Sequence, residues 1–148
     1  MDLASAATPM NIVIIEDNQD HAKILKWAFE QSGRNDHLTF LADAEMALDF
    51  VIGAVREPAF APDLIVLDLN LPKIDGRAVL EKLKSNESTK RIPVIVLSSS
   101  EREDDVVVSY RLGANTYISK ALLLDQISKS MNTILEYWSH IAQLPSRK

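Results

Sequence analysis

Residues 64–67 are four consecutive apolar residues that lead directly into Asp68 and then into a turn that carries Pro72. An uninterrupted apolar run of this length predicts a strand buried on both faces, as in a parallel sheet. Asp68 would then stand at the carboxyl end of a central strand, the edge at which open α/β sheets bind ligands. A carboxylate there can ligate a metal ion or accept a phosphoryl group, so its chemistry depends on the side chains that reach the same edge.

Two hydrophobic periodicities alternate along the chain. Short apolar runs predict strands at residues 11–15, 38–41, 64–67, 94–97 and 117–118. Helical spacing of apolar residues predicts helices over residues 20–32, from an N-cap at Asp43, after Gly76, over residues 102–112 and over residues 125–142. This alternation predicts an α/β fold, a doubly wound five-stranded parallel sheet with five helices. We expect one domain over residues 11–142, with tails at residues 1–10 and 143–148.

The composition narrows the class of protein. The chain of 148 residues has no cysteine, which excludes a disulfide framework and thiolate metal sites. Its formal net charge of −5 argues against a surface that binds nucleic acid or anionic membranes. No apolar run approaches the ~20 residues of a membrane span, and the N-terminus lacks the features of a signal peptide. We therefore expect a cytoplasmic protein that binds neither DNA nor a membrane directly.

Charged and hydroxyl side chains follow four of the predicted strands. Glu16 and Asp17 follow the first strand and Asp68 the third. Ser98 follows the fourth strand and Lys120 the fifth. Taken singly, each is ordinary, because carboxylate pairs, serines and lysines after strands are usually solvated turn residues or helix caps. Because parallel strands end on one edge of the sheet, we expect all of these side chains to converge.

Three carboxylates in one place repel one another, and burial strengthens the repulsion. A divalent cation removes the conflict, and Mg²⁺ suits the site because it prefers oxygen ligands and pairs with phosphate. We expect Asp17 and Asp68 to ligate Mg²⁺ directly, Glu16 to ligate it through water, and the backbone carbonyl of Asn70 to complete the set.

The remaining groups at this edge suit phosphoryl transfer, which needs charge neutralisation and in-line positioning. The Ser98 hydroxyl and the Lys120 ammonium can donate to phosphoryl oxygens. Asp68 is the expected nucleophile and would become a 4-aspartylphosphate, since carboxylates form acyl phosphates in enzymes.

From about residue 10 to residue 142, the chain resembles the receiver domain of two-component response regulators. The positions that match the family's acidic pair, phosphoacceptor, hydroxyl and lysine are Glu16, Asp17, Asp68, Ser98 and Lys120. The resemblance implies a flavodoxin-like fold and phosphotransfer to Asp68 from a phosphohistidine of a sensor histidine kinase. Tyr117 matches the family's aromatic switch residue, which implies a switch formed by Ser98 and Tyr117.

Shorter motifs resemble the small response regulators of bacterial phytochromes. These motifs lie at residues 68–76, 91–94, 112–115, 137–138 and 144–145. The narrower resemblance implies a phytochrome as the sensor kinase and a homodimer as the assembly. No DNA-binding module follows the last predicted helix, so we expect a stand-alone regulator.

Some apolar side chains cannot all be buried by one domain. Residues 106–108 are consecutive valines that sweep about 200° of a helix, so at least one is exposed, and we expect it to be Val106, with Tyr110 on the same side. The last helix continues through Trp138, which we expect to overhang the sheet, the alternative being that Trp138 folds back onto its own sheet. With Tyr117, these residues form the predicted surface of a two-fold homodimer.

One feature departs from a simple match to the family. The family has a cis proline after the lysine, whereas this chain has Ala121, and a cis bond before a non-proline residue costs about 2.5–4 kcal/mol. The Lys120–Ala121 bond is therefore either trans or a strained cis bond. His21, His37 and His140 have no second ligand at metal spacing, so we expect surface histidines.

Two other classes of function share parts of this pattern. A phosphatase of the haloacid dehalogenase type uses Mg²⁺ and an aspartate after a strand, but it needs a second acid two residues later, where this chain has Asn70. A phosphate-independent receiver-like binding module usually lacks one of the essential acids or the lysine. We therefore expect a signalling phosphoacceptor that catalyses only its own phosphotransfer and dephosphorylation, rather than an enzyme with other substrates.

Overall fold

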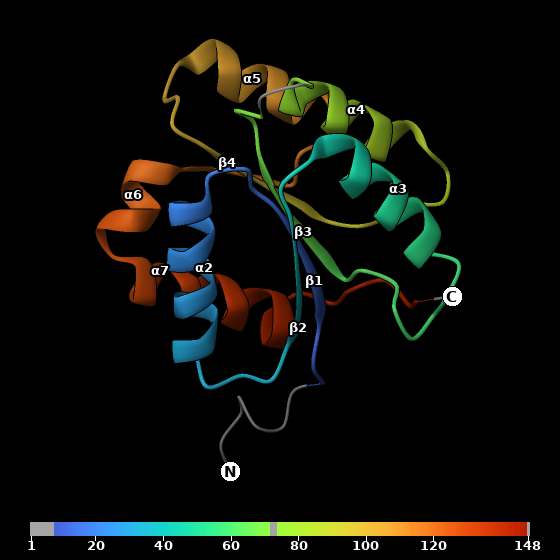
Figure 1. Cartoon of the computed structure of the whole chain (residues 1–148), viewed down its shortest axis with the longest axis horizontal. Coiled ribbons are helices and arrows are strands. Elements are labelled where there is room, and N and C mark those ends of the chain that lie inside the picture. The colour runs from blue at the N-terminus through green and yellow to red at the C-terminus, as the bar shows by residue number, and fades with distance from the viewer. Residues whose placement is uncertain (1–7, 72–73, 148) are drawn as a thin grey trace.

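A five-stranded parallel sheet lies at the centre of the protein, which a computed structural model describes over residues 8–71 and 74–147 (Figure 1). The strands are β1 (Asn11–Ile15), β2 (His37–Leu41), β3 (Leu64–Asp68), β4 (Val94–Ser98) and β5 (Thr116–Ser119). They lie in the order β2-β1-β3-β4-β5, and each neighbouring pair is parallel. The predicted doubly wound parallel sheet is confirmed. Residues 1–7 of the predicted N-terminal tail, Pro72 of the turn after β3, and Lys148 lie outside the described residues.

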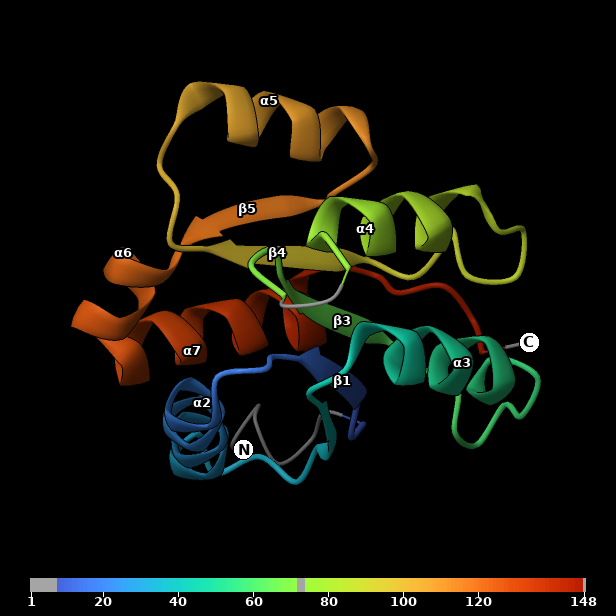
Figure 2. The same cartoon turned by 45° about the horizontal axis from the view of Figure 1, so that its top comes forward.

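Helices cover both faces of this sheet. They are α2 (Gln19–Gln31), α3 (Ala44–Ala54), α4 (Gly76–Ser85), α5 (Glu103–Arg111), α6 (Lys120–Asp125) and α7 (Ile127–Glu136), followed by the π-helical turn η1 (Tyr137–Ile141). In Figure 2, α3 and α4 lie on one side of the sheet and α2 and α7 on the other. Each side has its own apolar core, because successive strand residues point to opposite faces. Val13 and Ile15 pack with α3 and α4, whereas Ile12 and Ile14 pack with α2 and α7.

The central strand β3 is buried along its whole length, as its unbroken apolar run predicts. It pairs with β1 on one side and with β4 on the other. The chain leaves β1 through α2 toward β2, but it leaves β3 through α4 toward β4. The order of strands therefore reverses between β1 and β3, and such a switch point opens a crevice at the carboxyl ends of the strands.

Capping side chains and a glycine fix the ends of two helices. The side chain of Asp43 caps α3 by accepting from the backbone N–H of Met46 at 3.0 Å, as expected from the sequence. Asn18 caps α2 by accepting from the N–H groups of Asp20 and His21. Gly33 follows α2 and has a φ of 74°, in the left-handed region that glycine occupies without strain.

The C-terminal third of the chain differs from the expected single helix over residues 125–142. Helix α6 begins at Lys120, directly after β5, because the hydroxyl of Ser119 accepts from the N–H of Leu122. The chain then breaks at Gln126, whose φ of −133° and ψ of 58° interrupt the helix before α7. The described residues thus form six α-helices and a π-helical turn rather than five helices. They contain no cis peptide bond, so the Lys120–Ala121 bond is trans.

None of the helices in the described ranges combines the length and the apolar character that crossing a membrane requires.

Candidate functional site

The crevice between β1 and β3 gathers the side chains that the sequence places after the strands. Glu16 follows β1, Asp68 is the last residue of β3, and Lys120 is the first residue of α6. The ammonium of Lys120 lies 2.7 Å from Glu16 Oε1 and 3.0 Å from Asp68 Oδ2. Ser98, the last residue of β4, is buried. Lys120 reaches across from the end of β5 to carboxylates on two other strands, as the parallel arrangement requires.

The carboxylates of Glu16, Asp17 and Asp68 form a compact cluster. Each offers an oxygen atom, and these oxygens lie within 4.8 Å of one another. Glu16 and Asp68 are only 4% and 3% exposed. Glu16 Oε2 is buried without a hydrogen-bond partner among the described residues, which is costly for a carboxylate unless another group satisfies it. An oxygen-ligated divalent cation such as Mg²⁺ fits this donor set.

Asn70 has a more peripheral position than the carboxylates. Its backbone N–H donates to Asp68 Oδ1 at 3.0 Å, and its exposed side chain donates to Ser99 Oγ at 2.8 Å. The proposed ligation of a metal by its backbone carbonyl stays a prediction. The first of these bonds holds one oxygen of Asp68 and leaves the other to Lys120.

Burial and the neighbouring charges separate the titration of the two buried acids. Burial raises the pKa of Glu16 to about 7, and Asp68 adds to this rise while Lys120 opposes it. Burial alone would raise the pKa of Asp68, but hydrogen bonds with Glu16, the Asn70 N–H and Lys120 outweigh it and lower the pKa. Burial acts to lower the pKa of Lys120, but its bonds with Glu16 and Asp68 outweigh burial and raise it. Asp68 and Lys120 are therefore both charged at neutral pH.

The raised pKa of Glu16 predicts that stability depends on pH when no divalent cation is present. A folded-state pKa of about 7, above the ordinary glutamate value of 4.5, means that the folded protein binds this proton more tightly than the unfolded chain does. The contribution of protonated Glu16 to the stability of the folded protein is complete below pH 4.5 and is lost as the pH rises through 7. At about 1.4 kcal/mol per pKa unit, the free energy of unfolding should fall by on the order of 2–3 kcal/mol over this window. Urea denaturation in EDTA between pH 4.5 and 8 measures it.

The matched control is Glu16→Gln, which keeps an acceptor for Lys120 but removes the titration. The titration of Asp68 does not affect this comparison. Because the pKa of Asp68 is lowered from 3.8, Asp68 changes the stability only below pH 3.8, outside the range of pH 4.5 to 8. The difference in stability between wild type and Glu16→Gln should change with pH. Parallel pH profiles for the two proteins would contradict the assignment of this titration to Glu16.

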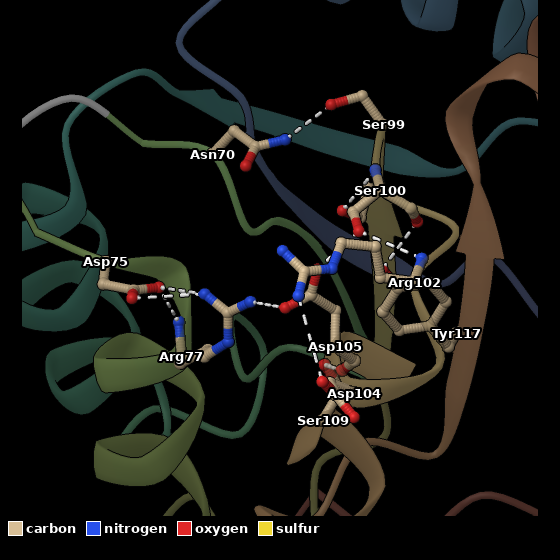
Figure 3. Close-up of polar contacts among 11 residues, drawn as sticks. Asn70, Asp75, Arg77, Ser99, Ser100, Arg102, Asp104, Asp105, Ser109 and Tyr117 are labelled. Atoms are coloured by element: carbon tan, nitrogen blue, oxygen red, sulfur yellow. Dashed lines mark hydrogen bonds and ion pairs between the residues drawn. The ribbon is translucent and has the colours of Figure 1, made fainter. Parts of the chain in front are cut away.

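A polar network continues from Ser98 into the loop between β4 and α5. Figure 3 shows Ser100 of this loop beside Tyr117. The Ser98 hydroxyl accepts from the N–H of Ser100 at 3.0 Å. The hydroxyl of Tyr117 donates to the carbonyl of Ser100 at 2.8 Å. Tyr117 is half-buried and packs against the core beneath α3 and α4, so only part of its side chain remains accessible. Ser100 thus connects the two residues of the expected switch.

An arginine on α4 connects this helix to α5 (Figure 3). The guanidinium of Arg77 pairs with Asp75 at 3.2 Å and with Asp105. Asp105 also accepts from the hydroxyl of Ser100. The sequence alone did not single out these residues, because polar residues in the first turns of helices are common and carry no signal of a long-range contact.

His21 also belongs to the site, so the expectation of a surface histidine is wrong for it. Its Nδ1 lies 3.1 Å from the ammonium of Lys120 and 3.5 Å from Glu16 Oε1. The cap at Asn18 starts α2 at Gln19, and this start places His21 in the first turn of the helix, beside the crevice. His37 is exposed, as expected.

The exposure of two residues of the expected dimer surface differs from the prediction. Val106 is half-buried and Val108 is exposed, because Val106 lies three residues before the buried Ser109 and shares its side of α5. Trp138 packs against the core beneath α2 and α7 instead of overhanging the sheet. The exposed aromatic residue there is its neighbour Tyr137. Tyr110 is exposed, as expected, and its hydroxyl accepts from the backbone N–H of Tyr117 at 3.1 Å.

Comparison with known protein families assigns most of the chain to one domain family. The model of the response regulator receiver domain matches residues 12–132. Among curated proteins, the response regulator Rcp1 of Synechocystis is 37% identical, with 93% of this chain and 95% of Rcp1 covered. The probable methanogenesis regulatory protein FilR2 of Methanothrix harundinacea is 35% identical, with 93% of this chain and 88% of FilR2 covered.

Solved structures show the same similarity. The Mn²⁺-bound form of Rcp1 has a TM-score of 0.80 at 36% identity, with 93% of this chain and 99% of that chain covered. The phosphorylated cyanobacterial phytochrome response regulator RcpA has a TM-score of 0.81 at 38% identity, with 94% of this chain and 100% of that chain covered.

Proposed function

The chain belongs to the response regulator receiver domain family, and we propose that it is a cytoplasmic phosphoacceptor that takes a phosphoryl group from a sensor histidine kinase onto Asp68. The observation that supports this most strongly is the convergence of Lys120 Nζ on Asp68 Oδ2 and Glu16 Oε1, beside the three-carboxylate cluster. The proposed domain spans residues 11–142. The identified family makes a signalling phosphoacceptor the natural reading of this site.

The proposed chemistry uses the site as it is built. An oxygen of Asp68 forms a bond to phosphorus while the phosphorus–nitrogen bond of the donor phosphohistidine breaks, and the leaving imidazole retains the bonding electron pair and takes up a proton. Lys120 and Ser98 donate to phosphoryl oxygens. When bound by Glu16, Asp17 and Asp68, with the carbonyl of Asn70, Mg²⁺ supplies positive charge that offsets the charge of the phosphoryl group.

Intact-mass spectrometry with a small phosphodonor, such as phosphoramidate, tests this proposal. We expect a gain of one phosphoryl group that requires Mg²⁺. Continuous turnover of a phosphate ester would instead favour the phosphatase class, and a protein that never gains phosphate would favour the binding module.

We propose a phytochrome as the partner kinase. The support is the set of phytochrome-type sequence motifs and the similarity to RcpA, a cyanobacterial phytochrome response regulator. Phosphotransfer from a purified bacterial phytochrome kinase, at a rate well above that from unrelated kinases, is the expected result.

We also propose that Ser98 and Tyr117 form the switch, with Ser100 between them. A phosphoryl group on Asp68 offers Ser98 new acceptors, and a moving Ser98 hydroxyl would release the N–H of Ser100. Because Tyr117 bonds to the carbonyl of Ser100, its surroundings would change with the loop. A ligand shifts such an equilibrium only through contacts that differ between the two states, and the proposed bond from Ser98 to the phosphoryl group would be such a contact.

Replacing Ser98 with alanine should separate phosphorylation from its consequences. We expect the Ser98→Ala variant to gain phosphate, although more slowly, and to lose most of the phosphate-dependent change in Tyr117. NMR of selectively labelled tyrosine measures this change. Ser99→Ala is the matched control, because the Ser99 hydroxyl bonds to Asn70 outside the Ser98–Ser100–Tyr117 chain. An unchanged tyrosine response in Ser98→Ala would contradict the coupling.

A homodimer is the proposed assembly, formed through Val108 and Tyr110 on α5 together with Tyr117 on β5. Val108 and Tyr110 are exposed apolar and aromatic side chains, which often mark contact surfaces. Light scattering at high micromolar concentration should show a dimer for wild type and a monomer for Val108→Asp. Met46→Asp places the same charge on the exposed side of α3 and should remain dimeric. A monomeric wild type, with and without phosphorylation, would contradict this assembly.

A further inference from the structure

The ammonium of Lys120 has three acceptors in the structure, and one of them is not a carboxylate. The bonds are 2.7 Å to Glu16 Oε1, 3.0 Å to Asp68 Oδ2 and 3.1 Å to Nδ1 of His21. A lysine ammonium has three N–H donors and no acceptor, so the three bonds use its full capacity. Because Lys120 can only donate, the Nδ1 atom of His21 accepts, and the proton of the neutral ring is on Nε2.

The two carboxylate acceptors have other work in the proposed reaction. An oxygen of Asp68 forms the proposed bond to phosphorus, and Glu16 belongs to the carboxylate cluster that fits a cation. Among the three acceptors that the structure shows, His21 is the one that neither forms the bond to phosphorus nor belongs to the carboxylate cluster. It therefore differs in kind from the other partners of this lysine.

The backbone holds His21 in place for this role. Asn18 Oδ1 accepts from the N–H of His21 at 3.1 Å and from the N–H of Asp20 at 3.0 Å, which orders the first turn of α2. The side chain of His21 is 32% exposed, whereas that of Lys120 is 9% exposed. Of the three acceptors of this ammonium, the imidazole is thus the most exposed, whereas Glu16 and Asp68 are buried.

We propose that His21 is a positioning residue for Lys120. Its Nδ1 holds the ammonium between strands β1 and β3, where the ammonium can donate to a phosphoryl oxygen on Asp68. This inference rests on the proposed function of Asp68 as the phosphoacceptor. Small displacements of a positioned group are costly in catalysis, so the bond matters even though His21 does not touch the reacting atoms.

Two substitutions of His21 separate the acceptor from the ring. His21→Leu replaces the imidazole with a side chain of similar size that has no hydrogen-bond acceptor. His21→Asn keeps an acceptor, because Oδ1 of asparagine occupies nearly the position of Nδ1 of histidine. With phosphoramidate and Mg²⁺, we expect kcat/KM for phosphorylation to fall about tenfold in His21→Leu, as expected for a lost bond to a charged group, and to recover to within about threefold of wild type in His21→Asn. The affinity for Mg²⁺, measured by calorimetry, should change less than about twofold in both. His37→Leu, at an exposed histidine of β2, should leave kcat/KM and Mg²⁺ affinity unchanged.

A second readout does not depend on phosphorylation. In metal-free protein labelled with ¹⁵N-lysine, we expect a slowly exchanging Nζ signal for Lys120 in wild type and His21→Asn, and its loss in His21→Leu. If wild type gains no phosphate, the proposed function fails while this signal still tests the bond. Equal kcat/KM in wild type and His21→Leu would overturn the inference, as would an Asn variant as slow as the Leu variant. A fall in Mg²⁺ affinity that parallels the fall in rate would also overturn it, because His21 would then act through the carboxylates.

Discussion

Replacing Asp68 with asparagine should abolish phosphorylation of the protein completely, because an amide oxygen cannot form the acyl phosphate that a carboxylate forms. Asp68 lies 3.0 Å from the ammonium of Lys120 and within the carboxylate cluster. Lys120 and a cation bound by the cluster can therefore offset the negative charge of a phosphoryl group on Asp68. Intact-mass spectrometry with phosphoramidate and Mg²⁺ measures the change. The phosphate on wild type should be released by alkali, as an acyl phosphate is, and should not form in EDTA.

Asp63→Asn provides the control for this prediction. Asp63 stands just before β3, at the opposite end of the strand from Asp68, and bonds to the N–H of Asn11 and to the guanidinium of Arg147. The variant should gain phosphate as wild type does, even if it is less stable. Phosphate on Asp68→Asn, or phosphorylation of wild type that EDTA does not reduce, would rule out the proposed chemistry.

Replacing Gly76 with alanine should destabilise the protein by about 3 kcal/mol, a typical cost of overpacking a buried position. Gly76 begins α4 where the helix meets the end of β3, and its N–H donates to the carbonyl of Leu69 at 3.0 Å. A Cβ atom at this position would lie 2.4 Å from the Cα of Leu69 and 2.8 Å from the carbonyl oxygen of Asp68. Backbone atoms on both sides would have to move apart. Urea denaturation measures the loss, and the rate of phosphorylation should fall as well because the displaced backbone carries Asp68.

Gly53→Ala is the matched control. Gly53 lies near the end of α3, is exposed, and a Cβ atom there would meet nothing within 4 Å. Alanine at such a helical site should stabilise the protein by about 0.5–1 kcal/mol, since it restricts the unfolded chain more than glycine does. Equal stability changes at the two positions would contradict the argument from close approach.

The elements that the sequence predicted best are those with a strong local pattern. The apolar run of residues 64–67 identified the buried central strand, and Asp43 identified the start of α3. The meeting of Glu16, Asp68 and Lys120 also followed from the sequence, because parallel strands end on one edge whatever their order. These predictions need only the period of each element and the rule that parallel strands share an edge.

The start of α6 could not be predicted in the same way. Residues 121–124 are apolar without a helical spacing, and the family pattern of a cis bond after the lysine suggested a loop. The helix begins there because the hydroxyl of Ser119 caps it and the Lys120–Ala121 bond is trans. A serine at the end of a strand does not by itself reveal which of its local bonds it will make.

By itself, the sequence determined the strands, most of the helices and the strand ends at which charged groups gather, because hydrophobic period and caps act within a few residues. Only the tertiary structure decided which side chains of different elements touch: His21 with Lys120, Arg77 with Asp105, and Trp138 with its own core. Such contacts depend on the rotation and translation of one helix relative to another, which arise from packing of the whole core. Periodicity states which face of its own element a residue occupies, but it carries no record of the partner that faces it.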